Sequence, residues 1–523
     1  MRTHPGRPST RRPVLLALTV AVTLVSAACS AGGQGESAQD QTLRTASTRD
    51  FKAAPQGRSL VFDTLLDLDE NGDPVPLLAE SWENSADQRT YTFTLKDGVS
   101  FHDGTPFSAE TAKFSIEYAA TTVPFGRFIS SVDAVDPSTV RISLTAPYSL
   151  LLDNLASELS VKMISPTSVV PAGDLAGKLD NYIGTGPYRL ENYRKDQDAE
   201  LVRNQEYWGG APALERIVWL TIPDPYTQVL ALRAGEVDLI GAAEHHSALP
   251  YSEMAKLNRA GEYTVEYRSY GRYQVIDFNT IRAPLDDARV RQAFNAAVDR
   301  EAMVATLFEG LAEPVRYLNP TSDVWKLGPQ VGLAGFAYDP DRANALLDEA
   351  GWLRADPTGV RTKDGNPLRV SLLVPFGEAN ADVTSLYVQS ELRKVGAQVE
   401  VTTLDSSAAA ERRKSGDYDM YVHHSCSTAT TGCLGPDGKY TTGYGFPGVY
   451  ATPELDRLIE QALTAEDEPA QRAAFDQVWE TLHREAVGLP LYDIAKPVAY
   501  RQGVSGFGFG STMFTMDLRD VKV

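Results

Sequence analysis

Strand-like and helix-like patterns alternate in residues 369–423, which read RVSLLVPFGEANADVTSLYVQSELRKVGAQVEVTTLDSSAAAERRKSGDYDMYVH. Short apolar runs predict strands at residues 369–374, 398–403 and 418–423, and helical spacing predicts helices at residues 383–395 and 408–414. This β-α-β-α-β order is typical of a mainly parallel sheet with helices on both faces. Because ligands of open parallel sheets bind beyond the carboxyl ends of the strands, the loop of residues 424–448 is the first candidate for a binding surface.

Two further helices are predicted upstream of this segment. Asp287 lies at the start of one, which places Val290 and Phe294 on the same face. Asp339 caps the second, and Gly351 follows its end. The second half of the chain is therefore predicted to be an α/β unit.

The first folded third alternates short strands with turns instead. Asn71-Gly72 predicts a hairpin, because both turn positions tolerate positive φ. Residues 91–95 alternate like a half-buried strand, and Ser108 starts a helix. The glycine cluster of residues 184–188 lacks the lysine or third glycine of a phosphate-binding loop, so we predict a tight turn between strands.

A basic and then apolar leader precedes Cys29. Its apolar run, residues 14–28, is too short to span a bilayer but has the length and small-residue ending of a secretory signal. Cys29 after these small residues resembles the lipobox of bacterial lipoproteins, which implies cleavage before Cys29 and acylation of its thiol. Residues 30–41 are polar enough to form a flexible tether. The alternative is ordinary secretion in which Cys29 has no role.

Size and charge narrow the classes of function. The rest of the chain, about 480 residues, exceeds what one core supports, so two or more lobes are expected. The net charge of -20 argues against nucleic acid and anionic lipid as partners. After Cys29 only Cys426 and Cys433 remain, and three possibilities stay open: a disulfide, two free thiols, or a metal site shared with His423 and His424.

Motifs of known catalytic classes are absent from the sequence. There is no Gly-x-Ser-x-Gly elbow, no phosphate-binding lysine loop and no His-Glu-x-x-His. Adjacent side chains on a regular element point in different directions, so the pairs His245-His246 and His423-His424 can each offer at most one metal ligand on a given face. No enzymatic activity, bound cofactor or catalytic residue is expected.

Several separated motifs together resemble the solute-binding proteins of peptide- and nickel-type ABC importers, known as family 5. The resemblance covers nearly the whole mature chain. The residues that carry it are 77–82, 91–96, 101–107, 184–188, 204–208, 233–238, 284–300, 338–340, 416–420 and 482–490.

This resemblance implies an α/β, two-lobed periplasmic-binding-protein-like fold of type II, in the large variant, with a ligand cleft at the hinge. It implies a first lobe of residues 42–282 with an extra subdomain at about 74–175, a second lobe of residues 283–490, and a C-terminal segment, 491–523, that returns to the first lobe. The expected protein is a monomer on the outer face of the cell membrane that delivers its ligand to an ABC permease and its ATPase. A receptor that presents the ligand to a sensor is an alternative.

The resemblance leaves the ligand open between a peptide or peptide-like solute and a nickel or other metal chelate. Peptide-type members commonly hold the ligand's amino terminus with an aspartate soon after the strand that ends near residue 423, whereas the next acid in this chain is Asp437. Nickel-type members hold chelators with arginine and aromatic residues. Our hypothesis for the site follows from both types and comprises Phe125, Arg127, Tyr421, His423, His424, Cys426 and Tyr444.

Overall fold

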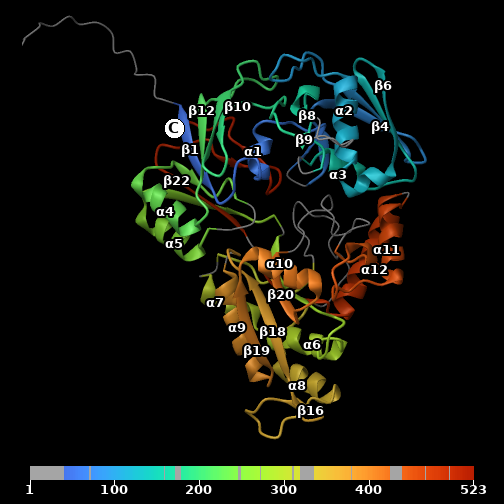
Figure 1. Cartoon of the computed structure of the whole chain (residues 1–523), viewed down its shortest axis with the longest axis vertical. Helices are drawn as coiled ribbons and strands as arrows, with labels where there is room; N and C mark the ends of the chain where they lie inside the picture. Colours follow the sequence, from blue (N-terminus) through green and yellow to red (C-terminus); the bar gives the residue numbers. More distant parts are fainter. Residues whose placement is uncertain are drawn as a thin grey trace, which may run out of the picture. The chain divides into compact units, whose positions relative to one another are not determined.

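A computed structural model describes residues 41–69, 72–157, 160–170, 178–244, 249–270, 272–308, 311–318, 335–378, 380–424, 439–465, 467–493 and 495–523. These residues fold mainly into three large sheets with their helices (Figure 1). Residues 40–523 form one compact unit. Among the described residues, no helix combines the length and the apolar character needed to cross a membrane.

The first sheet has seven strands and includes β1, which begins the folded chain, and β22, which lies near its end. Its order is β10 (Tyr188–Arg194), β11 (Asp198–Arg203), β12 (Arg216–Thr221), β1 (Thr42–Ser47), β13 (Leu239–Ile240), β22 (Lys496–Arg501) and β14 (Tyr263–Arg268). The strand β1 runs parallel to β12 and β13, and the other pairs are antiparallel. The helices of this part are α1 (Pro55–Ser59), α4 (Pro225–Ala234) and α5 (Tyr251–Ala260).

An antiparallel four-stranded sheet forms within the predicted extra subdomain. Its order is β4 (Ala79–Asn84), β5 (Thr90–Leu95), β7 (Thr139–Leu144) and β6 (Ile129–Asp136). The helical segments here are α2 (Ala109–Ala120), the 3-10 turn η1 (Pro124–Phe128) and α3 (Leu151–Leu155). The expected cap of α2 is confirmed, because Ser108 and Thr111 form a capping box. The predicted hairpin is also confirmed by the pairing of β2 (Leu66–Leu68) with β3 (Pro74–Pro76).

The third sheet has five strands and confirms the alternation predicted for residues 369–423. Its order is β19 (Gln398–Leu404), β18 (Arg369–Pro375), β20 (Met420–His424), β15 (Tyr273–Phe278) and β21 (Gly488–Asp493). The strand β18 is parallel to β19 and β20, whereas β15 pairs antiparallel with β20 and β21. The strands β15 and β21 come from outside the alternating segment, and β15 alone of the five runs opposite to the others, so local periodicity did not indicate this part of the sheet.

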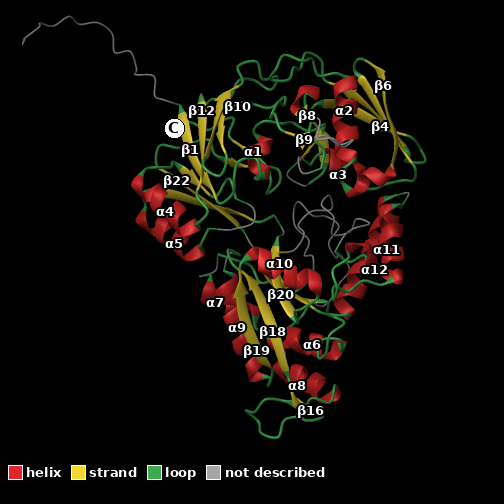
Figure 2. Ribbon diagram, viewed as in Figure 1, coloured by secondary structure: helices red, strands yellow, loops and turns green. Residues whose placement is uncertain are grey.

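Helices cover both faces of the five-stranded sheet (Figure 2). One face packs against α6 (Ala288–Ala297), α7 (Arg300–Leu307), α8 (Pro340–Glu349) and α9 (Ala381–Lys394). The other face packs against α10 (Ser406–Ser415). The paired helices α11 (Pro453–Leu463) and α12 (Glu468–Arg484) lie in the chain between β20 and β21. Asp287 and Asp339 cap α6 and α8, as predicted.

The remaining elements are short. They are β8 (Val169–Val170) paired with β9 (Lys178–Leu179), β16 (Thr362–Lys363) paired with β17 (Asn366–Pro367), β23 (Gly508–Phe509) paired with β24 (Met516–Asp517), and the 3-10 turns η2 (Pro166–Ser168) and η4 (Thr442–Tyr444).

We call the part built on the seven- and four-stranded sheets the first lobe and the part built on the five-stranded sheet the second lobe. The chain enters the second lobe's sheet at Tyr273 and leaves it at Asp493. The boundaries at residues 282 and 490 stay predictions.

The glycine cluster packs against the segment that follows α1, at residues 60–62, and has a structural role. A Cβ on Gly184 or Gly186 would meet the backbone of Val61 at 2.0 and 2.6 Å, so only glycine fits. Between these glycines, Thr185 Oγ1 donates to the buried carboxylate of Asp63 at 2.9 Å, and Trp208 Nε1 donates to it at 2.8 Å. The motifs of residues 184–188 and 204–208 therefore share one buried aspartate that lies more than 120 residues before them.

The two connections between the sheets are tied together by a hydrogen bond. Residues 269–272 join β14 to β15, and residues 494–495 join β21 to β22. Ser269 Oγ donates to Asp493 Oδ2 at 2.5 Å across these connections. Burial raises the pKa of Asp493 to about 6, and the nearby Glu313 adds to this effect.

Asp493→Asn is expected to stabilise the protein at pH 7.5 by roughly 1–3 kcal/mol. A carboxyl whose folded pKa is raised stabilises the fold when protonated, and this contribution is lost as the pH rises from about 4 through about 6. Asparagine is uncharged at all pH values, so the variant and the wild type should have similar stability at pH 4. Urea unfolding at both pH values measures the difference. An equal effect at pH 4 and pH 7.5 would contradict the prediction, and Asp417→Asn at an exposed position serves as the control.

Candidate functional site

Polar side chains of the first lobe gather where β1 and β13 end. Thr48 and Arg49 follow β1, and Glu244 follows β13. Glu244 is buried and accepts hydrogen bonds from Thr48 Oγ1 at 2.7 Å, from Thr48 N and from Gln228 Nε2 at 3.1 Å. Burial raises the pKa of Glu244. These hydrogen bonds fix the segment that carries Arg49.

Polar side chains of the second lobe gather at the corresponding end of its sheet. Glu378 follows β18, His424 ends β20, and Arg272 precedes the antiparallel β15. His424 Nδ1 lies 2.9 Å from Glu378 Oε2. Burial lowers the pKa of His424 although Glu378 opposes this, so the imidazole is neutral at pH 7. The buried Arg272 guanidinium has its pKa lowered to about 10 by burial, with Glu378 again opposing.

Glu378 is the acid that these basic groups share. Its charge acts on Arg272 and His424 of its own lobe and on Arg49 of the first lobe. Burial lowers the pKa of Arg49, while Glu244 and Glu378 raise it. The strand ends of both lobes therefore contribute to one group of mixed charge, as expected for ligand sites beyond the carboxyl ends of parallel strands.

A second charged group lies on the α10 side of the five-stranded sheet. Asp277 Oδ2 accepts hydrogen bonds from His423 Nε2 at 2.7 Å and Arg413 Nη2 at 3.1 Å, and its Oδ1 accepts one from Lys439 Nζ at 2.5 Å. Lys439 Nζ also lies 2.9 Å from His423 Nε2. Burial would raise the pKa of Asp277, but its neighbours lower it well below the usual range. Burial lowers the pKa of His423 to about 4, so this imidazole is neutral at pH 7. The positive charge that balances Asp277 therefore comes from Arg413 and Lys439.

Aromatic rings surround this second group. The Arg413 guanidinium lies 4.9 Å from the ring centroid of Tyr421 and 5.2 Å from that of Phe446. Tyr444 contacts Phe446, with 4.7 Å between ring centroids. Tyr421, His423 and Tyr444 are thus brought together around Asp277, and His424 lies at the end of the same strand beside Glu378.

The other predicted site residues lie elsewhere. Phe125 is buried in an apolar cluster, and Arg127 pairs with Glu460 of α11 at 2.8 Å. The predicted lipidation residue Cys29 and the predicted pair Cys426 and Cys433 fall outside the described residues. Among the described residues, no three His, Cys, Asp or Glu side chains come together as a metal site.

The sequence did not single out Arg49, Arg272, Glu378 or Asp277. Asp277 did carry a signal, because it interrupts the otherwise apolar end of the strand YQVIDF, residues 273–278. A charge buried in a strand requires a partner of opposite charge. Its partners, however, are 136 and 162 residues away in sequence.

Comparisons with known proteins show which family the chain belongs to. The family model described as "Bacterial extracellular solute-binding proteins, family 5 Middle" matches residues 73–433, more than half of the chain. The nickel-binding periplasmic protein of Escherichia coli K12 is 27% identical over 480 residues, which cover 89% of this chain and 90% of that protein. The glutathione-binding protein GsiB of Salmonella typhimurium is 27% identical over 486 residues, which cover 88% and 89% of the two chains.

Solved structures show the same fold. NikA from Brucella suis, determined in complex with Fe(III)-EDTA, has a TM-score of 0.83 and 29% identity over 92% of this chain and 99% of that one. The oligopeptide-binding protein AppA from Bacillus subtilis, determined with a nonapeptide, has a TM-score of 0.75 and 20% identity over 92% and 98%. The expected two-lobed α/β fold of periplasmic binding proteins is therefore confirmed. The chain belongs to family 5 of the bacterial extracellular solute-binding proteins.

Proposed function

We propose that this protein is the ligand-capturing subunit of an ABC importer and that its ligand is a small peptide or peptide-like solute. In this proposal a lipid on Cys29 and the polar segment of residues 30–41 hold a monomeric body at the outer face of the cell membrane. The body passes its ligand to a permease, and a separate ATPase subunit drives import. Membership of a solute-binding family supports this role.

The mixed charge around Glu378 is the observation that supports the ligand class. A peptide carries an ammonium group at one end and a carboxylate at the other. Glu378 can pair with the ammonium group, and Arg49 and Arg272 can pair with carboxylates. We therefore propose Glu378 as the amine anchor, in place of the aspartate that peptide-type relatives commonly carry after the strand. Glutathione, which one similar protein is named for binding, contains one ammonium and two carboxylates.

A metal chelate is the second candidate. A polycarboxylate chelator could pair with Arg49 and Arg272, and His424 lies beside them as a neutral imidazole that is able to ligate a metal. The similar proteins named for nickel and determined with Fe(III)-EDTA favour this candidate. In either case Tyr421, His423 and Tyr444 would form the wall built around Asp277.

Native mass spectrometry with metal analysis, on protein purified without chelators, is the test. It is followed by thermal shift measurements against di- and tripeptides, glutathione and Ni(II)-histidine. A ligand that binds the folded state raises the melting temperature by mass action. A peptide mass or shift without metal supports the first candidate, and a metal-containing mass supports the second. The absence of any adduct or shift at millimolar concentrations of all these solutes would contradict both.

A further inference from the structure

The helix α11 joins the two lobes at a place distant in sequence from the connecting segments. It lies in the chain between two strands of the second lobe, but its last turn contacts the extra subdomain of the first lobe. Ser149 N donates to Leu463 O at 2.9 Å, and Ser149 Oγ donates to Ala462 O at 3.2 Å. Two of the carbonyls that a helix end leaves without intrahelical partners are thus satisfied by the other lobe.

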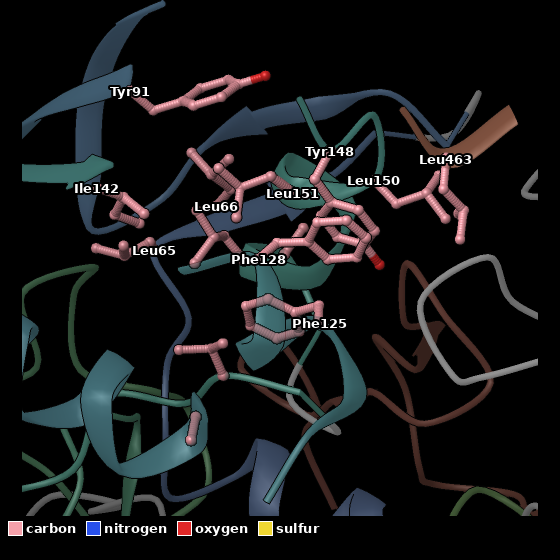
Figure 3. Packing of buried hydrophobic residues seen from close by; sticks show 14 of the residues in the cluster. Leu65, Leu66, Tyr91, Phe125, Phe128, Ile142, Tyr148, Leu150, Leu151 and Leu463 are labelled. Atoms are coloured by element: carbon pink, nitrogen blue, oxygen red, sulfur yellow. The ribbon is translucent and has the colours of Figure 1, made fainter. Parts of the chain in front are cut away.

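Apolar side chains support these hydrogen bonds. Leu463 packs beside Tyr148 and Leu150 of the extra subdomain (Figure 3). Tyr148 stacks on Phe128, with 4.4 Å between ring centroids, and lies over Phe125 at 6.2 Å. This apolar cluster continues through α12 to the face of the five-stranded sheet, so it spans both lobes.

An ion pair completes the contact at its rim. Arg127 Nη2 lies 2.8 Å from Glu460 Oε2, and both side chains are about half exposed. The Arg127 guanidinium also lies 4.4 Å from the ring centroid of Phe128. We call these interactions the α11 contact, formed by Arg127, Tyr148, Ser149 and Leu150 on one side and by Glu460, Ala462 and Leu463 on the other.

We propose that the α11 contact forms when the lobes close and that its strength sets the population of the closed form. This inference rests on the proposed function, in which two lobes close on a ligand. The chain passes between the sheets of the two lobes only after β14 and after β21, so a rotation of one lobe against the other must make or break any contact formed elsewhere between them. The rim of the contact is a half-exposed ion pair, and domains of one chain move relative to each other by default unless their interface is large and hydrophobic.

The consequence concerns ligand affinity. When only a fraction of the protein is in the binding-competent form, the apparent affinity equals the intrinsic affinity multiplied by that fraction. Arg127 would then influence the binding of every ligand equally, without touching any of them. This assigns Arg127 a positioning role in place of the ligand contact expected from the sequence.

A charge reversal tests the proposal without any ligand. Glu460→Arg places two positive charges at the rim of the contact, and Arg127→Glu in the same chain restores an attractive pair with exchanged signs. Small-angle X-ray scattering of the ligand-free protein gives the radius of gyration, and amide hydrogen exchange gives the opening of residues 453–463. We expect Glu460→Arg to increase the radius of gyration and to speed exchange roughly three- to tenfold, and the double variant to reverse both changes.

The ion pair between Arg203 and Glu215 provides the matched control. Its two charged atoms lie 3.0 Å apart, and both residues belong to the first lobe, so its reversal should leave the radius of gyration unchanged. An unchanged radius for Glu460→Arg, with faster exchange or a lower melting temperature alone, would show that the contact is fixed packing and would overturn the proposal. Because scattering needs no ligand, this failure is distinct from a failure to bind peptides.

Discussion

Asp277→Ala is expected to lower the free energy of unfolding by about 3–5 kcal/mol, which is the range for removing one partner of a buried ion pair. The carboxylate and the Lys439 ammonium are each only 5% exposed, and the Arg413 guanidinium is 13% exposed. Without Asp277 two positive charges would remain buried next to each other and next to His423. The cost is the desolvation of charges that no longer have a counter-charge.

Urea unfolding of the wild type and the variant at pH 7 measures this change. Asp417→Ala is the matched control, because Asp417 also pairs with two arginines of the second lobe but is 59% exposed. Surface pairs of this kind contribute up to about 1 kcal/mol. Adding Lys439→Met to Asp277→Ala removes one uncompensated charge and should recover part of the loss. If Asp277→Ala and Asp417→Ala have equal effects, the buried group does not stabilise the fold in this way.

Glu378→Gln is expected to weaken the binding of a peptide with a free amino terminus about 10- to 100-fold. Hydrogen bonds to charged groups contribute about 1.5–3 kcal/mol, and 1.4 kcal/mol corresponds to a factor of ten. The charge of Glu378 acts on Arg49, Arg272 and His424, so glutamine leaves the arginines without the acid that offsets their charge. Their positive charges would then repel the ligand's ammonium group.

Isothermal titration calorimetry with glutathione and with N-acetylated glutathione separates this role from a general disturbance. The acetylated peptide lacks the ammonium group, so its affinity should be low for the wild type and should change little in Glu378→Gln. Glu411→Gln, an exposed acid on α10, is the protein-side control. Equal losses for both peptides would argue against an amine anchor at Glu378.

Local patterns in the sequence determined several of the secondary-structure elements. Ser108, Asp287 and Asp339 mark the starts of α2, α6 and α8 because a side-chain cap satisfies backbone groups within three residues of it. The strands β18, β19 and β20 were predicted from short apolar runs. This was possible because each run and the strand that it forms occupy the same few residues. Tyr421, His423 and His424 could be named as candidates because they lie at the end of one such strand, and their role in binding stays a prediction.

Only the tertiary structure decided which charged side chains meet. Arg127 was predicted as a site residue because it lies between Phe125 and Phe128, where nickel-type relatives could carry a binding arginine, but it pairs with Glu460, 333 residues later. Glu378 and Arg49 come from strand ends of different lobes, and Asp277 finds Arg413 and Lys439 far along the chain. Periodicity and caps are set by neighbours along the backbone, whereas the pairing of charges depends on distances that exist only after the sheets have packed. The sequence by itself therefore determined the elements and the family resemblance, and the packing of the two lobes decided the chemistry of the site.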